Sequence, residues 1–277
     1  MSGRVNLAGK NVLVTGGSMG LGFASAQACL QAGARVVICA RDEAAVQKAV
    51  GDLQTSVAAG NVRGLAADVT RIDEIETALD LLESDFGPLT SLVHAAAVQG
   101  PIGSITDVDP QEWLDTVRVD LFGAFLAVRQ TCARLKRGGG GRIVLFAGGG
   151  AAAPFPDFTA YACSKAGVVR LTETVAQEMA NDHIEINCLA PGLVATRMLE
   201  STLAAGHVPK VEPVPASLGA GTAAFLISDL AAGITGKFVA APYDGWRDWP
   251  DHLAELNDSD IFTLRRIVPG DRGMDWQ

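Results

Sequence analysis

The sequence predicts an α/β fold in which one doubly wound parallel sheet of about seven strands lies between two layers of helices. Short segments of strand length alternate along the chain with longer helical segments, a pattern typical of βαβ units with right-handed crossovers. The strand segments are apolar throughout instead of alternately apolar and polar, as expected for a sheet that is covered on both faces. Both observations favour a sheet buried between helices.

Seven segments fit strands, and helical segments follow most of them. The strands are expected at Asn11–Thr15, Arg35–Ala40, Arg63–Ala67, Ser91–Ala95, Arg142–Ala147, Glu185–Leu189 and Phe238–Ala241. The helices are expected at Leu21–Ala32, Glu43–Ala58, Ile72–Phe86, Pro110–Arg137 and Thr159–Asn181. Because ligands of such sheets bind at the carboxyl ends of the strands, the residues that directly follow each strand are the first candidates for a functional site.

Length and composition fit one domain with a C-terminal extension. The chain has 277 residues, of which 48% are hydrophobic and 19% are charged, which is enough apolar content for a large core. Residues 1–242 are expected to form the domain, and residues 243–277 an extension too short to fold alone. In the extension, Trp246 and Trp249 are expected to pack against the core or a partner subunit.

The charge of the chain argues against nucleic acid as a partner. The formal net charge is -9, so the basic surface of a nucleic-acid-binding protein is missing. Arg265 and Arg266 are expected to form surface ion pairs with acidic side chains of the extension. The alternative is that these two arginines bind a carboxylate or a phosphate.

Neither a membrane segment nor a cysteine-based site is expected. The longest apolar runs are shorter than the ~18 residues of a membrane span, and no signal-peptide pattern precedes the first strand, so we expect a cytoplasmic protein. The five cysteines form no Cys-x-x-Cys pair and their number is odd, which predicts buried free thiols, with no disulfide framework and no zinc or other metal site. They are Cys29, Cys39, Cys132, Cys163 and Cys188.

A glycine-rich turn is expected between the first strand and the first helix, at residues 15–22. Glycine allows positive φ and a close approach of the backbone, and a helix N-terminus offers free N–H groups to a pyrophosphate. The strand–turn–helix context favours this interpretation over a turn without a ligand. The candidate cofactor-binding residues of the turn are Gly16, Ser18, Met19, Gly20, Leu21 and Gly22.

A tyrosine and a lysine form the second motif. Tyr161 and Lys165 are four residues apart on a predicted helix, so they lie on one face of it. A neighbouring ammonium favours phenolate and is expected to lower the pKa of the tyrosine. Tyr161 is therefore a candidate acid/base that exchanges a proton with a carbonyl or alcohol while a hydride moves to or from a nicotinamide. Such pairs also occur by chance, but the position after the fifth strand favours the functional interpretation.

Together the Thr-Gly-x-x-x-Gly-x-Gly turn and the Tyr-x-x-x-Lys pair resemble the short-chain dehydrogenase/reductase family, over roughly residues 8–242. The resemblance implies a Rossmann-type fold and an NAD(P)-dependent oxidoreductase that interconverts a carbonyl and a secondary alcohol. It implies that Lys165 also binds the nicotinamide ribose. It further implies a homodimer or homotetramer formed through the helices near residues 110–137 and 159–181.

The resemblance assigns further cofactor contacts to residues that follow strands. Asp68 and Val69 are expected to hold the adenine, although Asp68 also fits an N-cap of the next helix. The turn after the sixth strand is expected to pass the nicotinamide, through the backbone of Leu193 or Val194 and the hydroxyl of Thr196. The remaining positions are Ala95, Ala96, Pro191 and Gly192.

The end of the second strand bears on the choice between NADP and NAD. Ala40 stands where an acid would bind the ribose hydroxyls of NAD, and Arg41 follows it. A guanidinium fits a 2′-phosphate, so NADP is the preferred cofactor. Asp42 would serve a ribose, and hence NAD, if the register slipped by two residues. The alternative is that Arg41 and Asp42 form only a solvated turn.

Three polar positions of the family pattern have changed in this sequence. The family serine is replaced by Gly148, the asparagine of the long helix by Asp120, and the first asparagine of the turn after the fourth strand by His94. Asp120, counted here with the catalytic residues, is expected to pair with Lys165 or His94 and to alter proton transfer. His94 is either a substrate-side proton carrier or a packed side chain.

Without the serine, a different group has to hold the substrate oxygen. Backbone N–H groups of Gly148 and Gly149 are candidates for this. Ser164, Thr159 and Asp157 are also near Tyr161 in sequence, and Ser164 is ordinary at its position in the family.

The loss of the serine leaves an alternative function open. In this alternative the chain is a non-redox or regulatory homologue that binds the dinucleotide, or a lyase or isomerase. Residues 199–215 are expected to form a mobile loop or short helices over the site.

Overall fold

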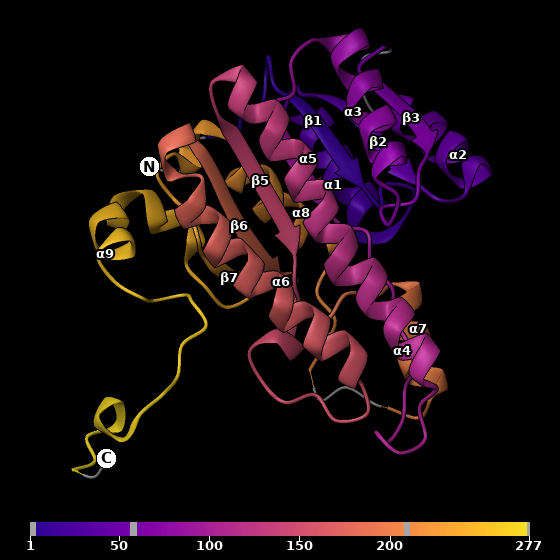
Figure 1. The fold of residues 1–277 in the computed structure, drawn as a ribbon. Coiled ribbons are helices and arrows are strands. Elements are labelled where there is room, and N and C mark those ends of the chain that lie inside the picture. The colour runs from indigo at the N-terminus through magenta and orange to yellow at the C-terminus, as the bar shows by residue number, and fades with distance from the viewer. Residues whose placement is uncertain (1–3, 56–59, 208–210, 276–277) are drawn as a thin grey trace.

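The computed structural model describes residues 4–55, 60–207 and 211–275, and it confirms the predicted architecture. Seven strands form one sheet in the order β3-β2-β1-β4-β5-β6-β7, and every neighbouring pair is parallel. Figure 1 shows the helices on both sides of this sheet. The strands are β1 (Asn11–Thr15), β2 (Arg35–Ala40), β3 (Val62–Ala66), β4 (Ser91–His94), β5 (Gly141–Phe146), β6 (Ile184–Ala190) and β7 (Phe238–Ala240).

The helices agree with the sequence prediction in order, with two main differences. They are α1 (Gly20–Gln31), α2 (Glu43–Gln54), α3 (Ile72–Phe86), α4 (Pro110–Val117), α5 (Gly123–Gly138), α6 (Thr159–Glu178), α7 (Arg197–Ala204), α8 (Ala216–Leu226) and α9 (Leu253–Asn257). The helix expected at Pro110–Arg137 is divided by a π-helical turn, Arg118–Phe122. Helix α8 was not predicted, because most of its residues are buried, so its sequence has no apolar residues at helical spacing, and its two glycines weaken the helical propensity. The predicted end of the second helix, residues 56–58, lies outside the described residues.

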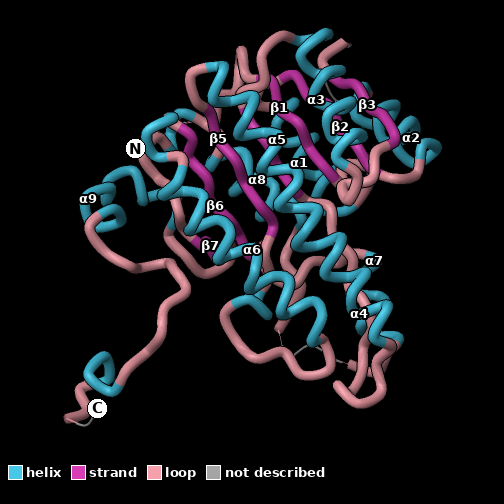
Figure 2. Tube along the Cα trace, in the orientation of Figure 1, coloured by secondary structure: helices cyan, strands magenta, loops and turns pink. Residues whose placement is uncertain are grey.

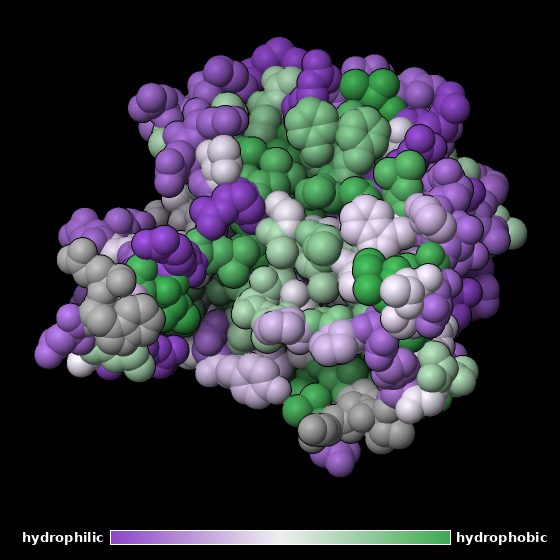
Figure 3. Space-filling model, turned by 60° about the horizontal axis from the view of Figure 1, so that its bottom comes forward, coloured by the Kyte–Doolittle hydropathy of each residue, from purple (hydrophilic) through white to green (hydrophobic). Residues whose placement is uncertain are grey.

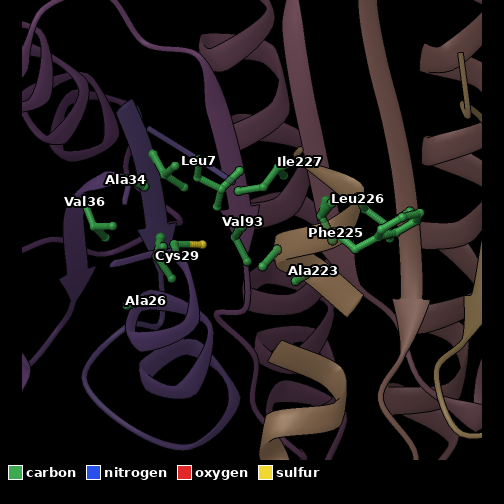
Figure 4. Close-up of a cluster of buried hydrophobic side chains, with 14 of the residues drawn as sticks. Leu7, Ala26, Cys29, Ala34, Val36, Val93, Ala223, Phe225, Leu226 and Ile227 are labelled. Carbon is green, nitrogen blue, oxygen red and sulfur yellow. The ribbon is translucent and has the colours of Figure 1, made fainter. Parts of the chain in front are cut away.

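Each face of the sheet is covered by its own apolar cluster. Val12 and Val14 of β1 pack on the side of α1, α2 and α8, whereas Leu13 between them packs on the side of α3, α5 and α6. All three side chains are fully buried. The strand is therefore apolar throughout because neighbouring residues alternate between two buried faces. Figure 4 shows part of the first cluster, in which the Cys29 side chain of α1 points toward Val93, with Ala223 of α8 beyond it.

The first part of the C-terminal extension packs on the core, as one of the two sequence alternatives predicted. Trp246 and Trp249 are buried, and their rings lie 5.1 Å from Phe225 and 4.5 Å from Phe262. After α9 the carbonyl of Phe262 accepts from the N–H of Phe238 in β7, and beyond Leu264 the chain runs away from the sheet to a short 3-10 helix, Pro269–Arg272 (Figures 1 and 2). Residues 276–277 lie outside the described part.

The ion pairs predicted for Arg265 and Arg266 are present for one of these two arginines. Arg265 pairs with Asp260 at 2.9 Å and with Asp271 at 2.6 Å, both within the extension. For Arg266, the described residues contain no ion pair. The two ion pairs of Arg265 therefore connect residues within the extension.

The thiols agree only in part with the sequence prediction. All five cysteines are free; Cys29, Cys39 and Cys188 are buried, but Cys163 is exposed, so the expectation that all are buried was wrong. Between residues 4 and 275, outside the two gaps, no group of His, Cys, Asp and Glu side chains is arranged to hold a metal ion. Among the same residues no helix combines the length and apolarity needed to cross a bilayer.

Candidate active site

The glycine turn between β1 and α1 is packed so closely at Gly16 and Gly22 that a side chain is excluded at both positions. A Cβ on Gly22 would lie 2.1 Å from the carbonyl oxygen of Gly16, and a Cβ on Gly16 would lie 2.7 Å from the nitrogen of Ala96. Gly16 and Gly20 also have φ of +66° and +54°, which other residues rarely adopt. The turn and the start of the loop after β4, Ala95 and Ala96, are therefore in direct contact.

The N-terminus of α1 has the properties of an anion site. Met19 at the N-cap position gives no side-chain cap, and the first turn contains no acidic residue. Its free N–H groups therefore keep their partial positive charge unopposed. Ser18 is partly exposed beside Met19. A cradle of glycines at the start of an uncapped helix fits the pyrophosphate of a dinucleotide.

The turn after β6 lies beside the glycine turn. A Cβ on Gly219 of α8 would meet both Pro191 at 2.8 Å and Leu21 at 3.3 Å, so these two side chains flank one point of α8. Gly192 has φ of +85° and packs on Pro242. These contacts bring together two segments that are about 170 residues apart in sequence, as a dinucleotide site at the carboxyl edge of the sheet requires.

Val194 and Thr196 continue this turn toward the glycine turn. Val194 is buried and pairs with Val214 in an isolated parallel bridge. The hydroxyl of Thr196 donates to the carbonyl of Val194 at 3.3 Å, and its methyl group lies 3.7 Å from the Cβ position of Gly20. Thr196 is thus next to the phosphate cradle.

The residues at the end of β2 have different partners. Arg41 is exposed, and it makes no ion pair with any described residue. The carboxylate of Asp42 accepts a hydrogen bond from the N–H of Ala45 at 3.0 Å and caps α2. The guanidinium of Arg41 therefore has no partner among the described residues, whereas one carboxylate oxygen of Asp42 is used by the cap.

Asp68 and Val69 follow β3, as the sequence indicated. The Asp68 carboxylate accepts from the N–H of Thr70 at 2.8 Å. The N-cap of α3 is Arg71, so the alternative role of Asp68 as the N-cap was wrong. Val69 is buried against Gly123, whose Cβ position lies 2.8 Å from the Val69 side chain.

Tyr161 lies over Gly148, at the carboxyl end of β5. A Cβ added to Gly148 would lie 2.7 Å from the phenolic oxygen of Tyr161. The φ of Gly148 is 179°, an extended conformation open to any residue, so the backbone itself does not require glycine here. The phenol fills the space in which the serine side chain of the family would begin.

Lys165 is buried one helical turn after Tyr161. Its ammonium donates to the carbonyl oxygen of Phe146 at 3.1 Å and lies 3.3 Å from a carboxylate oxygen of Asp120. It is also 5.4 Å from the centre of the Tyr161 ring. Since an ammonium has three N–H donors, these two oxygens leave one donor for a further partner.

The π-helical turn places Asp120 in this cluster. Asp120 is 1% exposed, and its second carboxylate oxygen accepts from the N–H of Val98 at 2.8 Å. A π turn rotates the helix relative to an α-helical register, and such turns are frequent at functional sites. Of the two partners considered from the sequence, the structure pairs Asp120 with Lys165.

Burial and charge shift the pKa values of this cluster. Burial raises the pKa of Tyr161, Lys165 lowers it, Asp120 raises it, and the net direction is upward. The expectation that the ammonium leaves the phenol with a lowered pKa was therefore wrong, because burial is the largest effect and Asp120 opposes the lysine. Burial lowers the pKa of Lys165, but Asp120 and Tyr161 raise it to a net increase.

Asp120 itself titrates above its ordinary range. Burial raises its pKa, while Lys165 and the N–H of Val98 lower it, and the net direction is upward. A buried carboxylate beside a buried ammonium is stabilised as a pair and not as two separate ions. The charge on Lys165 therefore acts on Asp120 as well as on Tyr161.

His94 is packed at the end of β4. It is 3% exposed, and its Nδ1 lies 2.8 Å from the hydroxyl of Thr15, while Nε2 has no partner among the described residues. Burial, with a smaller effect of Lys165, lowers the pKa of His94 to about 3. The imidazole is neutral at pH 7, which favours the packed side chain over the proton carrier.

The polar side chains near Tyr161 do not replace the missing serine. The Ser164 hydroxyl donates to the carbonyl of Ala160 at 2.8 Å, and the Thr159 hydroxyl accepts from Trp113 at 3.2 Å. Asp157 lies 3.9 Å from His207. Gly149 borders open space, since no atom lies within 4 Å of its Cβ position. Next to Gly148 there is thus open space, and none of the described contacts places the side chain of Ser164, Thr159 or Asp157 at Gly148.

Helix α7 lies beside the glycine turn and the loop after β4, and it carries two residues at the site that the sequence did not indicate, Arg197 and Thr202. It occupies part of the predicted loop at residues 199–215, of which 208–210 lie outside the described residues. The amide of Gln99, after β4, donates to the hydroxyl of Thr202. The guanidinium of Arg197 contacts the sulfur of Met19 in the glycine turn. Arg197 therefore adds a positive charge beside the phosphate cradle.

Comparison with known proteins agrees with this geometry. The sequence model described as short chain dehydrogenase matches residues 10–205. Dehydrogenase/reductase SDR family member 4 of Homo sapiens is 34% identical over 252 residues, which cover 86% of this chain and 88% of that protein. The chloroplastic NADPH-dependent aldehyde reductase 2 of Arabidopsis thaliana is 31% identical over 253 residues, covering 85% of this chain and 93% of its own.

A solved structure agrees as well. Actinorhodin polyketide ketoreductase with NADPH matches with a TM-score of 0.77 and 27% identity, over 83% of this chain and 95% of that one. The glycine cradle, the uncapped start of α1 and the free Arg41 fit the nicotinamide dinucleotide of such enzymes. The chain belongs to the short chain dehydrogenase family and is an oxidoreductase that uses a nicotinamide dinucleotide.

Proposed function

We propose that this protein is an NADP-preferring oxidoreductase that interconverts a carbonyl and a secondary alcohol, with Tyr161 as the acid/base. The observation that carries the proposal is the position of the Tyr161 hydroxyl. It lies over Gly148 at the carboxyl end of β5, beside open space at Gly149 and with Lys165 behind its ring. The bound cofactor supplies or accepts the hydride.

In the reducing direction Tyr161 donates its phenolic proton to the carbonyl oxygen, while the carbonyl carbon gains the hydride. The substrate thus gains one hydride and one proton and becomes an alcohol, and the tyrosine is left as phenolate until solvent returns a proton. In the oxidising direction the phenolate accepts the alcohol proton. Lys165 stabilises the phenolate by its charge, and its remaining N–H is available to a ribose hydroxyl.

The cofactor is proposed to lie along the carboxyl edge of the sheet. The turn at residues 16–22 holds the pyrophosphate on the N-terminus of α1, with Arg197 as a further cation. Arg41 binds the 2′-phosphate of NADP, because its guanidinium is free whereas Asp42 caps α2. Asp68 and Val69 bind the adenine, and the turn at residues 191–196 binds the nicotinamide.

A second candidate function has one observation in its favour. The hydroxyl of Ser164 donates to the carbonyl of Ala160, and the described contact of the Thr159 hydroxyl is with Trp113, so no described contact puts a hydroxyl in the place of the family serine beside Tyr161. Loss of one donor to a reacting oxygen costs about 10²–10³ in rate. A protein that binds the dinucleotide without turnover would show the same features.

A turnover assay that measures both the cofactor and the product distinguishes the oxidoreductase from the protein that only binds the dinucleotide. The purified protein is incubated with NADPH or NADH and a panel of aldehydes and ketones, and both cofactor oxidation and alcohol formation are measured. The proposal predicts that the two are equal in amount and faster with NADPH. Tight cofactor binding without turnover would favour the second candidate. Conversion of substrate with unchanged cofactor would indicate a lyase or isomerase.

The family resemblance also leads us to propose a homo-oligomer formed through α4, α5 and α6. These helices lie together on one side of the sheet (Figure 1). Light scattering of the full chain tests this, and the mass of a single chain at micromolar concentration would contradict it.

A further inference from the structure

We propose that Phe155 forms the binding surface for an aromatic group next to the substrate carbonyl, so that the preferred substrates are aryl ketones, aryl aldehydes and the matching alcohols. This inference rests on the proposed function of Tyr161. It assigns the substrate class, which neither the family nor the catalytic residues determine.

Phe155 is an apolar ring that its own chain covers only in part. It stacks on Phe158 with the ring centres 4.3 Å apart and an angle of 12° between the planes. Phe158 is buried, but Phe155 is 40% exposed. A ring that is stacked on one side and still this exposed presents its other face to solvent, where a second flat ring would remove apolar area from water.

The exposed ring is next to the proposed reacting group. The centres of the Phe155 and Tyr161 rings are 6.5 Å apart, with an angle of 63° between the planes. Phe155 also packs on Gly150, whose Cβ position lies 3.1 Å from the ring, and the neighbouring Gly149 borders open space. A substrate whose oxygen meets the Tyr161 hydroxyl would therefore place its carbonyl substituent toward Phe155.

The ring is held in position by the loop that carries it. The N–H of Phe158 donates to the carbonyl of Phe155 at 3.2 Å, and the carbonyl of Asp157 accepts from Gly103 at 2.9 Å. Behind Phe158 lies the imidazole of His207, with its ring centre 5.1 Å away. A preorganised aromatic surface loses little entropy when it binds a ligand, which makes it an effective contact.

Apolar residues also gather at the end of the molecule where the strands end (Figure 3). Figure 3 turns the lower end of the molecule, where the strands end, toward the viewer, and hydrophobic residues gather in the middle of this face with hydrophilic residues around them. A polar or charged substituent would lose its hydration against such a surface, whereas an aryl group would gain from burial.

The proposal is tested with two ketones that differ in this substituent. Initial rates with NADPH give KM for acetophenone and for butan-2-one in the wild type and in Phe155→Ala, Phe155→Leu and Ile267→Ala. Phe155→Ala is expected to raise KM for acetophenone about tenfold, on the scale of an aromatic contact, and to leave KM for butan-2-one nearly unchanged. Phe155→Leu, which keeps apolar area, is expected to lie between wild type and Phe155→Ala.

Ile267→Ala is the matched control, because it also shortens an exposed apolar side chain but in the C-terminal extension. It is expected to leave both KM values unchanged. Equal effects of Phe155→Ala on both ketones, an equal effect of Ile267→Ala, or no effect of Phe155→Ala would each overturn the proposal.

A binding measurement separates this proposal from the proposed function. The Kd of acetophenone is measured by calorimetry with NADPH-loaded Tyr161→Phe and with the double variant that adds Phe155→Ala. About tenfold weaker binding by the double variant supports the aromatic surface. If the wild type turned over neither ketone, that result would reject the redox function but not the aromatic surface. Equal Kd values would reject the aromatic surface alone.

Discussion

The ammonium of Lys165 lies 3.3 Å from the carboxylate of Asp120, and both side chains are almost completely buried. The π-helical turn that carries Asp120 makes this contact, and Val98 holds the other carboxylate oxygen. Lys165 also lies 5.4 Å from the centre of the Tyr161 ring, so Asp120 compensates part of the charge that acts on the phenol. Asp120 is therefore expected to set the pH range in which Tyr161 works.

Replacing Asp120 by asparagine is expected to move the pH profile to lower pH. Asp120 raises the pKa of Tyr161, so its neutralisation lowers that pKa. Alcohol oxidation needs the phenolate, so its rate would reach its plateau at lower pH. Carbonyl reduction needs the phenol, so the decline of its rate with rising pH would also begin at a lower pH. The measurement is kcat/KM against pH in both directions.

Asp115→Asn is the control for this profile, since it removes an exposed carboxylate from the neighbouring α4. It is expected to keep the wild-type profile. An Asp120→Asn profile that is unchanged, or that moves to higher pH, would show that Asp120 does not act on Tyr161.

A side chain at position 148 is expected to impair catalysis. The Cβ of Gly148→Ala would begin 2.7 Å from the Tyr161 hydroxyl, so the phenol has to move. Displacing a reacting group by about 1 Å costs on the order of 10² in rate, and we expect such a loss in kcat with unchanged cofactor Kd. Gly148→Ser meets the same contact, so the family's serine alone is also expected to lower kcat.

Gly149→Ala provides the comparison for this loss. Its Cβ position is free of neighbours within 4 Å, and its φ lies outside the positive range. The kcat of Gly149→Ala should match that of the wild type with a small ketone. An increase of kcat in Gly148→Ser would contradict the prediction, because the serine hydroxyl would then raise the rate by more than the displacement of Tyr161 lowers it.

Replacing Arg41 is expected to change the affinity for NADPH, whereas replacing Asp42 is expected to change the stability of the fold. Arg41→Ala removes the free guanidinium, and the Kd of NADPH should rise about tenfold while that of NADH stays the same. Asp42→Ala removes the cap on Ala45 and should cost about 1 kcal/mol of unfolding free energy without changing the ratio of the two Kd values. Fluorescence titration and urea unfolding measure these effects. A weaker NADH complex in Asp42→Ala alone would point to NAD instead.

The neutral His94 is expected to make the fold sensitive to acid. Its pKa is lowered to about 3 in the folded chain, against about 6.5 when unfolded. A depressed pKa stabilises the fold fully above pH 6.5, and this contribution is lost as the pH falls toward 3. Between pH 7 and pH 5 the loss amounts to about 2 kcal/mol.

His94→Asn lacks this titration, and asparagine is the family's residue at that position. Its unfolding free energy should therefore fall less than that of the wild type over the same pH interval. Urea unfolding at pH 7 and pH 5 gives the four values that are needed. Parallel losses in both proteins would mean that His94 titrates alike in the folded and unfolded chains.

The sheet and the glycine turn were predictable from the sequence because local patterns determine them. Helix α3 begins and ends at the predicted residues, Ile72 and Phe86, since its apolar residues recur at helical spacing between a polar start and a glycine. The position of Gly16 to Gly22 between a buried strand and a helix likewise needs only neighbouring residues. One-residue differences at strand ends reflect fraying that no local pattern encodes.

The charge balance at Tyr161 and the surface beside it were not predictable. The spacing of Tyr161 and Lys165 shows that they share a helix face, but only the fold shows how strongly burial and Asp120 act on the phenol. Arg197 and Met19 touch although they are 178 positions apart, and the exposure of Phe155 depends on how its loop packs. Such contacts arise from tertiary structure, which alone brings these segments together.

The most direct test of the account is the turnover of Tyr161→Phe with NADPH and a ketone that the wild type reduces. This change removes one oxygen atom and keeps the ring that packs near Phe155 and Lys165. The account predicts that kcat falls by about 10²–10⁴ while the Kd of NADPH stays at its wild-type value. A kcat equal to that of the wild type would contradict it, since another group would then have to donate the proton.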